Sequence, residues 1–488
     1  MSNIYRKTPV MGWASWNCFR TDINEERMKR QADLLVETGL ADCGYTYLNM
    51  DDGFFGGRDE NGDLLFHKDR FPNGIKPVAD HAHGLGLNAG IYAEGGDRTC
   101  AFYYDNEGKN GDGVGLYGHE KQDLEKFLIE CDFDFIKVDW CGGIRLALND
   151  KDQYTKIAEI IEDIRERTGK CIVFNICRWH FPGEWAVGIA DSWRTGADIT
   201  PDFKSILNQI DNVKPLRKFC SPGHVNDLDM MQIGNGLTPA EEKAHFIMWC
   251  MLSAPLMIGC DLEKIEDAAL GLLKNRRLIS INQDERCFQG YVVKEYTENG
   301  ELTGEVWYKP LSGENRAAVA FLNRSGKKMH MDLLELDDIT EAYDICGNKA
   351  AAKLAADVDP HGAEVFEIKR TGSDEPKDIN GGLIPDSRWE WWRPKYISLK
   401  EAERLRKNGA ALIDVRSEAE FGASHIEGAI NIPHTSIYRE IEKYVPDKDT
   451  PVITYCCTGK RGTQAQLALE YLFYKNMYIL IWDNKEEQ

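Results

Sequence analysis

Phe133–Gly143, with the sequence FDFIKVDWCGG, is the stretch that decides the fold. Its first half is rich in apolar side chains, as in a short buried strand, and it ends in Lys137, Asp139 and Cys141. Charged groups at the C-terminal end of a buried strand are where a β/α barrel keeps its chemistry. An isolated aspartate in this position is more often the cap of the next helix, so the rest of the chain has to decide between the two interpretations.

Strand-like runs alternate with amphipathic helical stretches up to residue 287, a pattern typical of a parallel α/β fold. The runs are residues 9–13, 45–52, 87–94, 133–140, 171–178, 191–198, 219–230 and 254–262. No GxGxxG motif follows the first run, which disfavours the alternative of a doubly wound sheet. The sequence therefore predicts an α/β fold with a (β/α)8 TIM barrel over residues 1–287.

The pattern changes after the barrel. Short alternating runs such as YVVKEYTE, GEVWYKPL and AEVFEIKR, separated by glycine and asparagine, predict an antiparallel β-sandwich over residues 288–370. The polar, glycine-containing residues 371–393 indicate a linker. Residues 394–488 alternate strands and helices again, which predicts a third, small α/β domain.

Composition limits the partners. The formal net charge of −21 argues against nucleic acid and anionic membrane surfaces. No stretch approaches the ~18 apolar residues of a membrane span, and the first residues contain no apolar signal segment, so we expect a cytoplasmic, bacterial-type protein. The 14 cysteines are scattered, and no CxxC pair indicates structural zinc. We expect no cofactor, and a homo-oligomer is left open.

Polar and aromatic groups follow most of the predicted barrel strands, and barrel geometry brings such strand ends to one face. Carboxylates mixed with tryptophan suit a sugar, because carboxylates accept from hydroxyls and indole faces stack on C–H surfaces. A divalent metal is the alternative for the aspartates, but the nearby cations neutralise their charge, so we expect none. The groups are Trp13, Trp16, Asp51, Asp52, Tyr92, Lys137, Asp139, Arg178, Trp179, Arg194, Asp198, Asp227 and Asp229.

The sequence resembles the α-galactosidases and α-N-acetylgalactosaminidases of glycoside hydrolase family 27 over about residues 7–370. The motifs are TPVMGWASWN, YLNMDDGF, GIYAEGGDRTC, FIKVDWC, SWRTGADI, NDLDMMQIGN and SAPLMIGCDL, followed by ISINQD, in the order of the family. The resemblance implies a retaining exo-glycosidase that hydrolyses terminal α-D-galactosyl residues of small galactosides or oligosaccharides by double displacement. It implies Asp139 as the nucleophile and Asp198 as the acid/base.

The resemblance also implies substrate contacts. Asp51 and Asp52 would bind the sugar's 4- and 6-hydroxyls, Lys137 the 3- and 4-hydroxyls, and Arg194 would lie near the 2-hydroxyl. The remaining pocket residues implied by the family are Trp16, Tyr92 and Asp229.

The loop CRWHFPGEW departs from the family, because Arg178 stands where members carry a glutamate or a small residue. That loop reads the 2-substituent, so we predict Arg178 and Trp179 as substrate-binding residues. The departure leaves open whether the 2-position carries a hydroxyl or an acetamido group, as in an α-N-acetylgalactosaminidase. A pentopyranose, as in a β-L-arabinopyranosidase, is also left open.

The proposed chemistry sets requirements on the two carboxyl groups. The nucleophile must be ionised, and we expect Lys137 to lower the pKa of Asp139. The acid must be protonated, which requires burial of Asp198 or a nearby negative charge. The family resemblance matches Cys100 and Cys141 to a pair that is disulfide-bonded in secreted relatives, and in a reducing cytoplasm the bond is left open. By the same resemblance Cys18 has lost its usual partner, because Gly53 occupies that position.

Two motifs, LIDVRSEAEFGASHIEGAINIP and VITYCCTGKRGTQA, mark the C-terminal unit. A cysteine directly after a buried strand, where the loop turns into a helix, has backbone N–H groups pointing at its sulfur. Lys460 and Arg461 add positive charge, so we predict a low pKa for the Cys456 thiol.

This unit resembles a rhodanese domain, which implies Cys456 as the persulfide carrier and Arg461 as the residue that closes its loop. It also implies a scaffold role for Asp414 and Arg416. The ending YILIWDNKEEQ lacks the family's usual Gly-Gly and final tryptophan helix, so the activity of the domain is left open. A sulfurtransferase or persulfide-sensing protein with a degenerate sugar-binding barrel is therefore the alternative of another class.

Overall fold

A computed structural model describes residues 7–372, 375–379, 396–434, 436–457, 461–462, 465–466, 469, 472 and 474–482, with the backbone alone for residues 438 and 439. The chain divides into two compact units. One contains Met1–Gly142 and Asn149–Leu383, and the other contains Gly143–Leu148 and Ile384–Gln488. Most of the predicted linker, and Lys460, lie outside the described residues.

Eight parallel strands form the sheet of the first unit, in the order β10-β1-β2-β5-β6-β7-β8-β9. They are β1 (Met11–Ala14), β2 (Tyr47–Met50), β5 (Asn88–Glu94), β6 (Phe135–Asp139), β7 (Val173–Ile176), β8 (Ser192–Arg194), β9 (Val225–Asp227) and β10 (Leu256–Ile258). A parallel bridge between Met231, just after β9, and Ile258 of β10 links the two ends of the sheet. Seven of these strands lie inside their predicted runs and β1 extends one residue beyond its run, to Ala14, so the predicted TIM barrel is confirmed.

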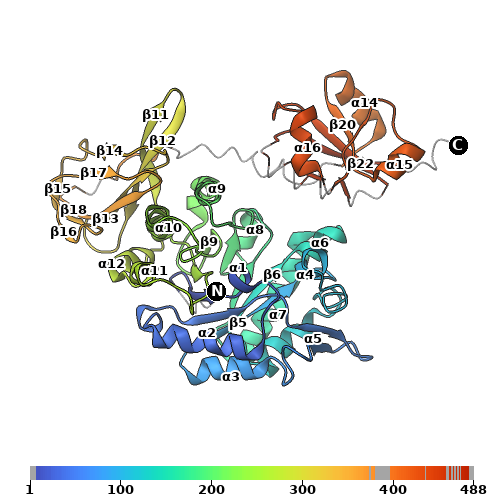
Figure 1. Cartoon of the computed structure of the whole chain (residues 1–488), viewed down its shortest axis with the longest axis horizontal. Helices are drawn as coiled ribbons and strands as arrows, with labels where there is room; N and C mark the ends of the chain where they lie inside the picture. Colours follow the sequence, from blue (N-terminus) through green and yellow to red (C-terminus); the bar gives the residue numbers. More distant parts are fainter. Residues whose placement is uncertain are drawn as a thin grey trace. The chain divides into compact units, whose positions relative to one another are not determined.

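Helices cover the outside of these strands (Figure 1). The longer ones are α2 (Glu25–Glu37), α3 (Lys76–Gly84), α7 (Asp150–Thr168), α9 (Phe203–Val213) and α10 (Pro239–Met251). The shorter ones are α1 (Trp16–Phe19), α4 (Cys100–Tyr104), α5 (Glu120–Glu125), α6 (Cys141–Arg145), α8 (Glu184–Val187), α11 (Asp267–Leu273) and α12 (Arg276–Asn282). Short 3₁₀ or π turns occupy Ala41–Cys43, Lys126–Glu130 and Lys214–Phe219, and β3 (Phe55–Arg58) pairs with β4 (Leu64–Phe66) in a loop.

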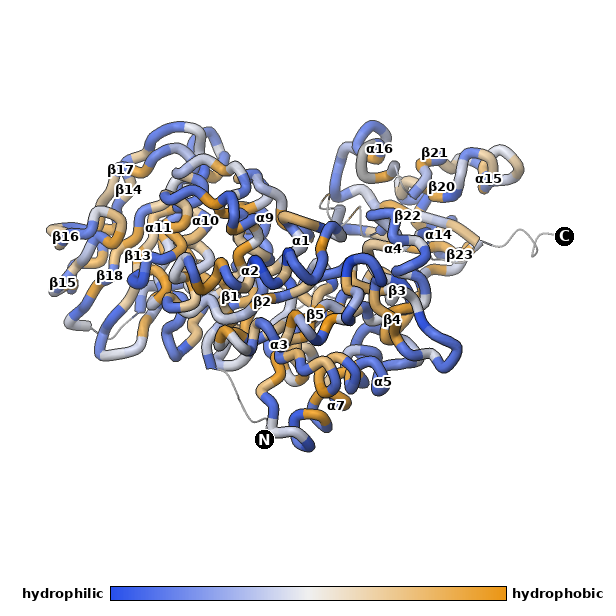
Figure 2. The backbone as a smooth tube through the Cα atoms, turned by 60° about the horizontal axis from the view of Figure 1, so that its bottom comes forward, coloured by the Kyte–Doolittle hydropathy of each residue, from blue (hydrophilic) through white to orange (hydrophobic). Residues whose placement is uncertain are grey.

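Helix α7 shows why these segments are helical. The Asn149 side chain accepts from the backbone N–H of Asp152, and Gly169 ends the helix with a positive φ of 71°. The isoleucines at positions 157, 161 and 164 are buried on one face. Figure 2 shows the same arrangement across the unit, with hydrophobic segments along the inner strands and hydrophilic segments on outer helices and turns.

Antiparallel strands follow the barrel within the same unit. A six-stranded sheet has the order β11-β12-β13-β18-β15-β16, and β14 pairs with β17 in a second sheet. Val319, Phe321, Met331, Val358 and Phe366 belong to the core that the two sheets share, as the predicted sandwich requires. The strands are β11 (Tyr291–Glu298), β12 (Glu301–Pro310), β13 (Arg316–Asn323), β14 (Met329–Asp332), β15 (Ile339–Asp344), β16 (Lys349–Ala350), β17 (Ala355–Val358) and β18 (Ala363–Arg370).

The second unit is a five-stranded parallel sheet in the order β19-β23-β22-β20-β21. Its strands are β19 (Tyr396–Ile397), β20 (Ala411–Asp414), β21 (Ile430–Asn431), β22 (Val452–Cys456) and β23 (Met477–Ile481), and its helices include α14 (Leu399–Lys407), α15 (Glu418–Ala423) and α16 (Ile437–Tyr444). Two hydrophobic clusters, one around Ile413 and one around Leu412, cover the sheet. The predicted small α/β fold is confirmed.

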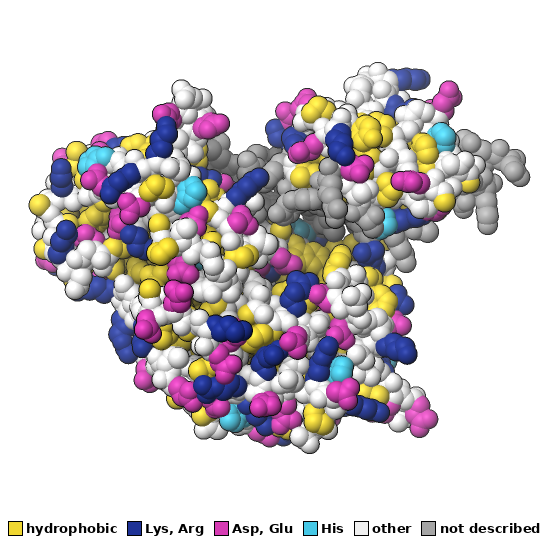
Figure 3. Space-filling model, in the orientation of Figure 1, with side chains coloured by type: hydrophobic (Ala, Val, Ile, Leu, Met, Phe, Trp, Pro, Cys, Tyr) yellow, Lys and Arg dark blue, Asp and Glu magenta, His cyan; other side chains and the backbone are white. Residues whose placement is uncertain are grey.

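Acidic and basic side chains are interspersed over the face shown in Figure 3. None of the described helices has the length and apolar character needed to cross a bilayer.

Candidate active site

The C-terminal ends of the barrel strands surround a cavity. It is lined by Trp16, Asn17, Asp51, Asp52, Tyr92, Cys100, Lys137, Asp139, Arg194, Asp198, Asp229 and Met230. The predicted residues Arg178 and Trp179 are not among its lining residues, and Trp13 is fully buried with its indole N–H donated to the Cys260 carbonyl. Asn17, Cys100 and Met230 also line the cavity, but they were not predicted to bind the substrate. Each of them adjoins a predicted residue or stands in one of the family motifs quoted above.

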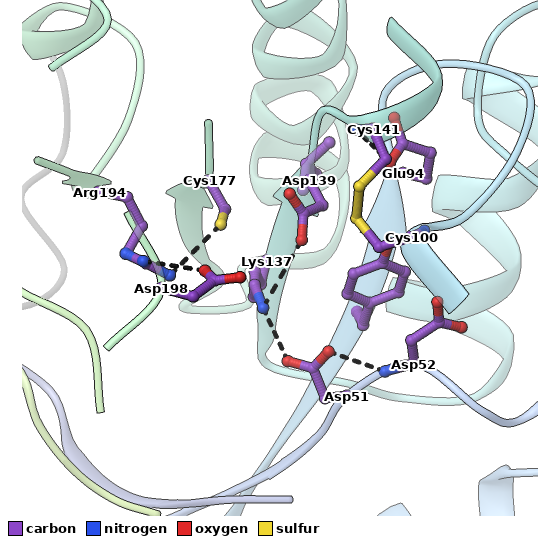
Figure 4. A network of polar contacts seen from close by, with 12 residues as sticks. Asp51, Asp52, Glu94, Cys100, Lys137, Asp139, Cys141, Cys177, Arg194 and Asp198 are labelled. Carbon is purple, nitrogen blue, oxygen red and sulfur yellow. Dashed lines mark hydrogen bonds and ion pairs between the residues drawn. A yellow bond between two sulfur atoms is a disulfide. The ribbon is translucent and has the colours of Figure 1, made fainter. Parts of the chain in front are cut away.

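Lys137 lies between two carboxylates (Figure 4). Its Nζ is 2.9 Å from Asp51 Oδ2 and 3.8 Å from Asp139 Oδ2. Asp139 Oδ1 also accepts from the backbone N–H of Trp140 at 3.0 Å. Because Lys137 and Asp139 are both on β6, with one residue between them, their side chains leave the same side of the strand.

Burial dominates the electrostatics of Asp139. Desolvation raises the pKa of its carboxyl to about 7, with Asp198 and Asp51 adding to the rise and the Lys137 ammonium opposing it. The expected lowering of the Asp139 pKa is wrong, because the net shift is upward. Lys137 by itself does lower this pKa, as expected. The cost of burying a charge exceeds the attraction of an ammonium group 3.8 Å away.

Arg194 connects the other carboxylates of the cavity. Its Nη2 is 3.1 Å from Asp198 Oδ1 and 2.8 Å from Asp229 Oδ2, and its Nη1 donates to Cys177 Sγ at 3.7 Å. The Asp198 side chain is 62% exposed, whereas that of Asp229 is 5% exposed. Of the two conditions considered for Asp198, burial is not met, whereas negative charges do lie near it: its charge helps to raise the pKa values of both Asp139 and Asp229.

Asp52 connects the cavity to the start of α4. Its Oδ1 accepts from the Gly53 N–H at 2.8 Å and its Oδ2 from the Ala101 N–H at 2.9 Å. Burial raises the pKa of this carboxyl to about 7, against the effect of these hydrogen bonds. The Tyr92 hydroxyl accepts from the preceding N–H, that of Cys100, at 3.2 Å. Two predicted sugar ligands, Asp52 and Tyr92, therefore also position α4.

A disulfide joins Cys100 and Cys141, which answers the question that the sequence left open. Cys18 is a free thiol. Gly53, which occupies the position of its usual partner in the resembled family, has φ +121°, and a Cβ built there would lie 2.8 Å from the Thr21 Cα. A side chain at residue 53 would require the local backbone to move, which explains why no half-cystine fits there.

The two predicted specificity residues, Arg178 and Trp179, lie outside the lining of the cavity. Arg178 is buried, with 3% of its side chain exposed, and its guanidinium forms an ion pair with Asp150 at the start of α7. Trp179, which follows, has a left-handed backbone with φ 63°, an uncommon conformation for a bulky residue.

Candidate metal ligands among the described residues fall in two groups, Glu94 with Cys100 and Cys141, and Asp344 with Cys346 and Glu364. The cysteines of the first group form the disulfide. Asp227, one of the aspartates first considered as a ligand, accepts from Asn175 Nδ2 at 2.8 Å.

In the second unit, Cys456 ends β22 and is fully buried. The Gly462 N–H donates to its sulfur at 3.4 Å. Arg461 forms two hydrogen bonds to Glu420, at 2.6 and 2.8 Å, and Arg416 pairs with Asp414 at 2.7 Å.

The raised pKa of Asp139 predicts a pH-dependent stability. Its folded-state pKa of about 7 exceeds the ~3.9 of an unfolded aspartate, so the ionised carboxyl destabilises the fold fully above about pH 7 and progressively less as the pH falls. Asp139→Asn should therefore raise the Tm at pH 8.5 by about 2–5 °C and by clearly less at pH 5, as measured by calorimetry. Asp337→Asn, at an exposed carboxylate of the antiparallel region, should show no such pH-dependent gain, and an equal gain at both pH values for Asp139→Asn would contradict the shift.

A TIM barrel with this mixture of aspartates, cations and tryptophan at its mouth defines the class as a barrel glycoside hydrolase with an appended α/β domain. Residues 8–284 match the family described as Alpha galactosidase A, and residues 398–485 match the rhodanese-like domain. The chain belongs to this alpha-galactosidase family and carries a rhodanese-like domain.

Its relatives agree. It is 39% identical over 317 residues to a probable alpha-galactosidase of Dictyostelium discoideum, covering 64% of this chain and 77% of that one. It is 37% identical over 336 residues to alpha-galactosidase A of Cellvibrio japonicus, covering 66% and 78%. The structure of alpha-galactosidase from Saccharomyces cerevisiae with raffinose has a TM-score of 0.65 at 25% identity, covering 75% of this chain and 98% of that one.

Proposed function

We propose that this protein is a retaining exo-α-galactosidase that removes terminal α-D-galactosyl residues from small galactosides or oligosaccharides. The observation that carries the proposal is that Asp139 of β6 and Asp198, just after β8, line one cavity together with Lys137 and Arg194. The names of the relatives, and the raffinose bound by the yeast enzyme, support a galactoside as the substrate.

The proposed reaction uses two carboxyl groups in two steps. Asp139 attacks the anomeric carbon while Asp198 gives its proton to the leaving oxygen, which produces a covalent galactosyl-enzyme. Water then attacks that intermediate, Asp198 takes the water's proton, and Asp139 leaves. The exposure of Asp198 suits this task, since the leaving group departs through the mouth of the cavity and water enters there.

The proposed sugar contacts are those that the family resemblance implies, and these seven residues line the cavity. Asp51, Asp52 and Lys137 bind the 3-, 4- and 6-hydroxyls, and Arg194 binds near the 2-hydroxyl. The other cavity residues that we propose contact the sugar are Trp16, Tyr92 and Asp229. Arg178 and Trp179 do not line this cavity. We propose that they shape the loop that lies beside the 2-position of the sugar.

The experiment that tests the function is a panel of aryl glycosides. We expect turnover of p-nitrophenyl α-galactoside, and little of the α-N-acetylgalactosaminide or the β-L-arabinopyranoside. A preference for the α-N-acetylgalactosaminide or the β-L-arabinopyranoside would show that this sugar, and not galactose, is the one the enzyme hydrolyses. No hydrolysis of any of the three, together with rapid thiocyanate formation from thiosulfate and cyanide, would favour the sulfurtransferase alternative.

For the C-terminal unit we propose a rhodanese-like role in which Cys456 carries a persulfide and Arg461 positions its loop. The buried sulfur and its N–H contact from Gly462 support that role. We also propose domain boundaries at residues 1–287, 288–370, 371–393 and 394–488. A cytoplasmic bacterial location is proposed on the basis of the twelve free thiols, against which stands the one disulfide, Cys100–Cys141.

A further inference from the structure

We propose that Tyr154 is a positioning residue for the catalytic carboxylate, acting through the backbone on both sides of the active site. The inference rests on the proposed function, because it assigns to α7 the task of fixing Asp139 for attack. Tyr154 does not touch the cavity; it lies on the first half of α7 and is fully buried behind β6 and β7.

The Tyr154 hydroxyl lies between two strand ends. It is 3.1 Å from the Val138 carbonyl oxygen of β6 and 3.2 Å from the Cys177 carbonyl oxygen just after β7. A phenol has one proton to donate, so the two carbonyls share it. Val138 directly precedes Asp139, and Cys177 offers its sulfur to Arg194. One hydroxyl therefore contacts the backbone that carries the nucleophile and the residue that supports the arginine beside Asp198.

The ring of Tyr154 reaches the other neighbour of Asp139. It packs against the Trp140 ring with centroids 4.9 Å apart, and the backbone N–H of Trp140 donates to Asp139 Oδ1. Trp185 stacks on Tyr154 at 6.1 Å. Tyr154 thus contacts the residues immediately before and after the nucleophile.

Strand β5 fixes the same segment from the opposite direction. The Gly95 N–H donates to the Asp139 carbonyl at 2.8 Å, and Glu94 Oε2 accepts from the Cys141 N–H at 2.9 Å. The segment from Val138 to Cys141 is held between β5 and α7. Removing the α7 contact leaves the strand pairing in place, because the Cys177 N–H still donates to the Val138 carbonyl at 2.9 Å. Loss of the hydroxyl should then misplace the carboxylate without unfolding the barrel.

The test compares Tyr154→Phe with Tyr45→Phe. Tyr45 is equally buried in the same barrel, and its hydroxyl donates to the Leu273 carbonyl at 2.9 Å, so both substitutions remove one buried hydroxyl that contacts backbone carbonyl oxygens, two at Tyr154 and one at Tyr45. We expect similar losses of Tm from the two variants. We expect Tyr154→Phe alone to lower kcat on p-nitrophenyl α-galactoside, by about 10- to 100-fold, with KM changed less than about twofold.

A second readout separates positioning from general damage. The rate of covalent labelling by a fluorinated galactosyl fluoride should fall for Tyr154→Phe in proportion to kcat and be unchanged for Tyr45→Phe. Equal kcat values in the two variants, or a rise in KM with kcat preserved, would overturn the assignment of Tyr154. An inactive wild-type enzyme would instead overturn the proposed function, so the two failures are distinguishable.

Discussion

Asp139→Asn is expected to abolish turnover of galactosides while leaving sugar binding largely intact. Asparagine keeps the size of the side chain and an oxygen that can accept the Trp140 N–H, but it cannot form the covalent intermediate. We expect kcat on p-nitrophenyl α-galactoside to fall by about 10⁴-fold or more. Titration calorimetry with galactose should give a Kd within about tenfold of the wild-type value.

The matched control is Asp357→Asn, which makes the same chemical change at an exposed carboxylate of the antiparallel region. It should leave kcat and the Kd of galactose unchanged. A normal rate for Asp139→Asn would show that another group attacks the anomeric carbon.

Asp198→Ala is expected to give a loss that depends on the leaving group. A sugar or alkyl aglycone needs the proton of Asp198, so hydrolysis of melibiose should fall by about 10²- to 10⁴-fold. A dinitrophenyl group leaves without that proton, so formation of the intermediate from a dinitrophenyl galactoside should be much less affected. Arg194 keeps its 2.8 Å ion pair with Asp229, which preserves the wall of the cavity.

Two further measurements accompany this variant. Added azide should accelerate turnover, because it attacks the intermediate without needing a general base, and the product should be an α-galactosyl azide. The acid limb of the pH profile should also move to lower pH, since the charge of Asp198 contributes to the raised pKa of Asp139. Equal losses on both substrates with no effect of azide would argue against the acid/base role.

The barrel could be predicted because its signals are local. Each parallel strand is a short apolar run, and the cap of a helix such as α7 is set by neighbours in the sequence, Asn149 and Gly169. The weakest predicted run, residues 219–230, contains a strand of only three residues, Val225–Asp227. Glycine and proline break that run, so it could be placed but not bounded.

The candidate site could be predicted in its membership but not in its energetics. Strand-end aspartates converge on one cavity because of barrel geometry, whereas the pKa of Asp139 depends on the depth of burial, which no local pattern reveals. The Arg178–Asp150 ion pair joins two residues 28 positions apart in the sequence, and only the fold brings them together. Arg178 therefore looked like a cavity residue from its place after β7.

Tyr154 illustrates the same limit. In the sequence it is one apolar position of an amphipathic helix, with Ile157 and Ile161 on the same face. Its hydroxyl matters only because α7 packs where β6 and β7 end, which is a tertiary relation.

The assignment of the nucleophile is tested most directly by the mass of peptides from enzyme treated with a fluorinated galactosyl fluoride. This reagent forms the covalent intermediate faster than the intermediate is hydrolysed. One fluorogalactosyl group is expected on the peptide that contains Asp139, and none on the same peptide of Asp139→Asn. A label on another carboxylate, or turnover of galactosides with no label at all, would contradict the assignment of Asp139 as the nucleophile of a retaining α-galactosidase.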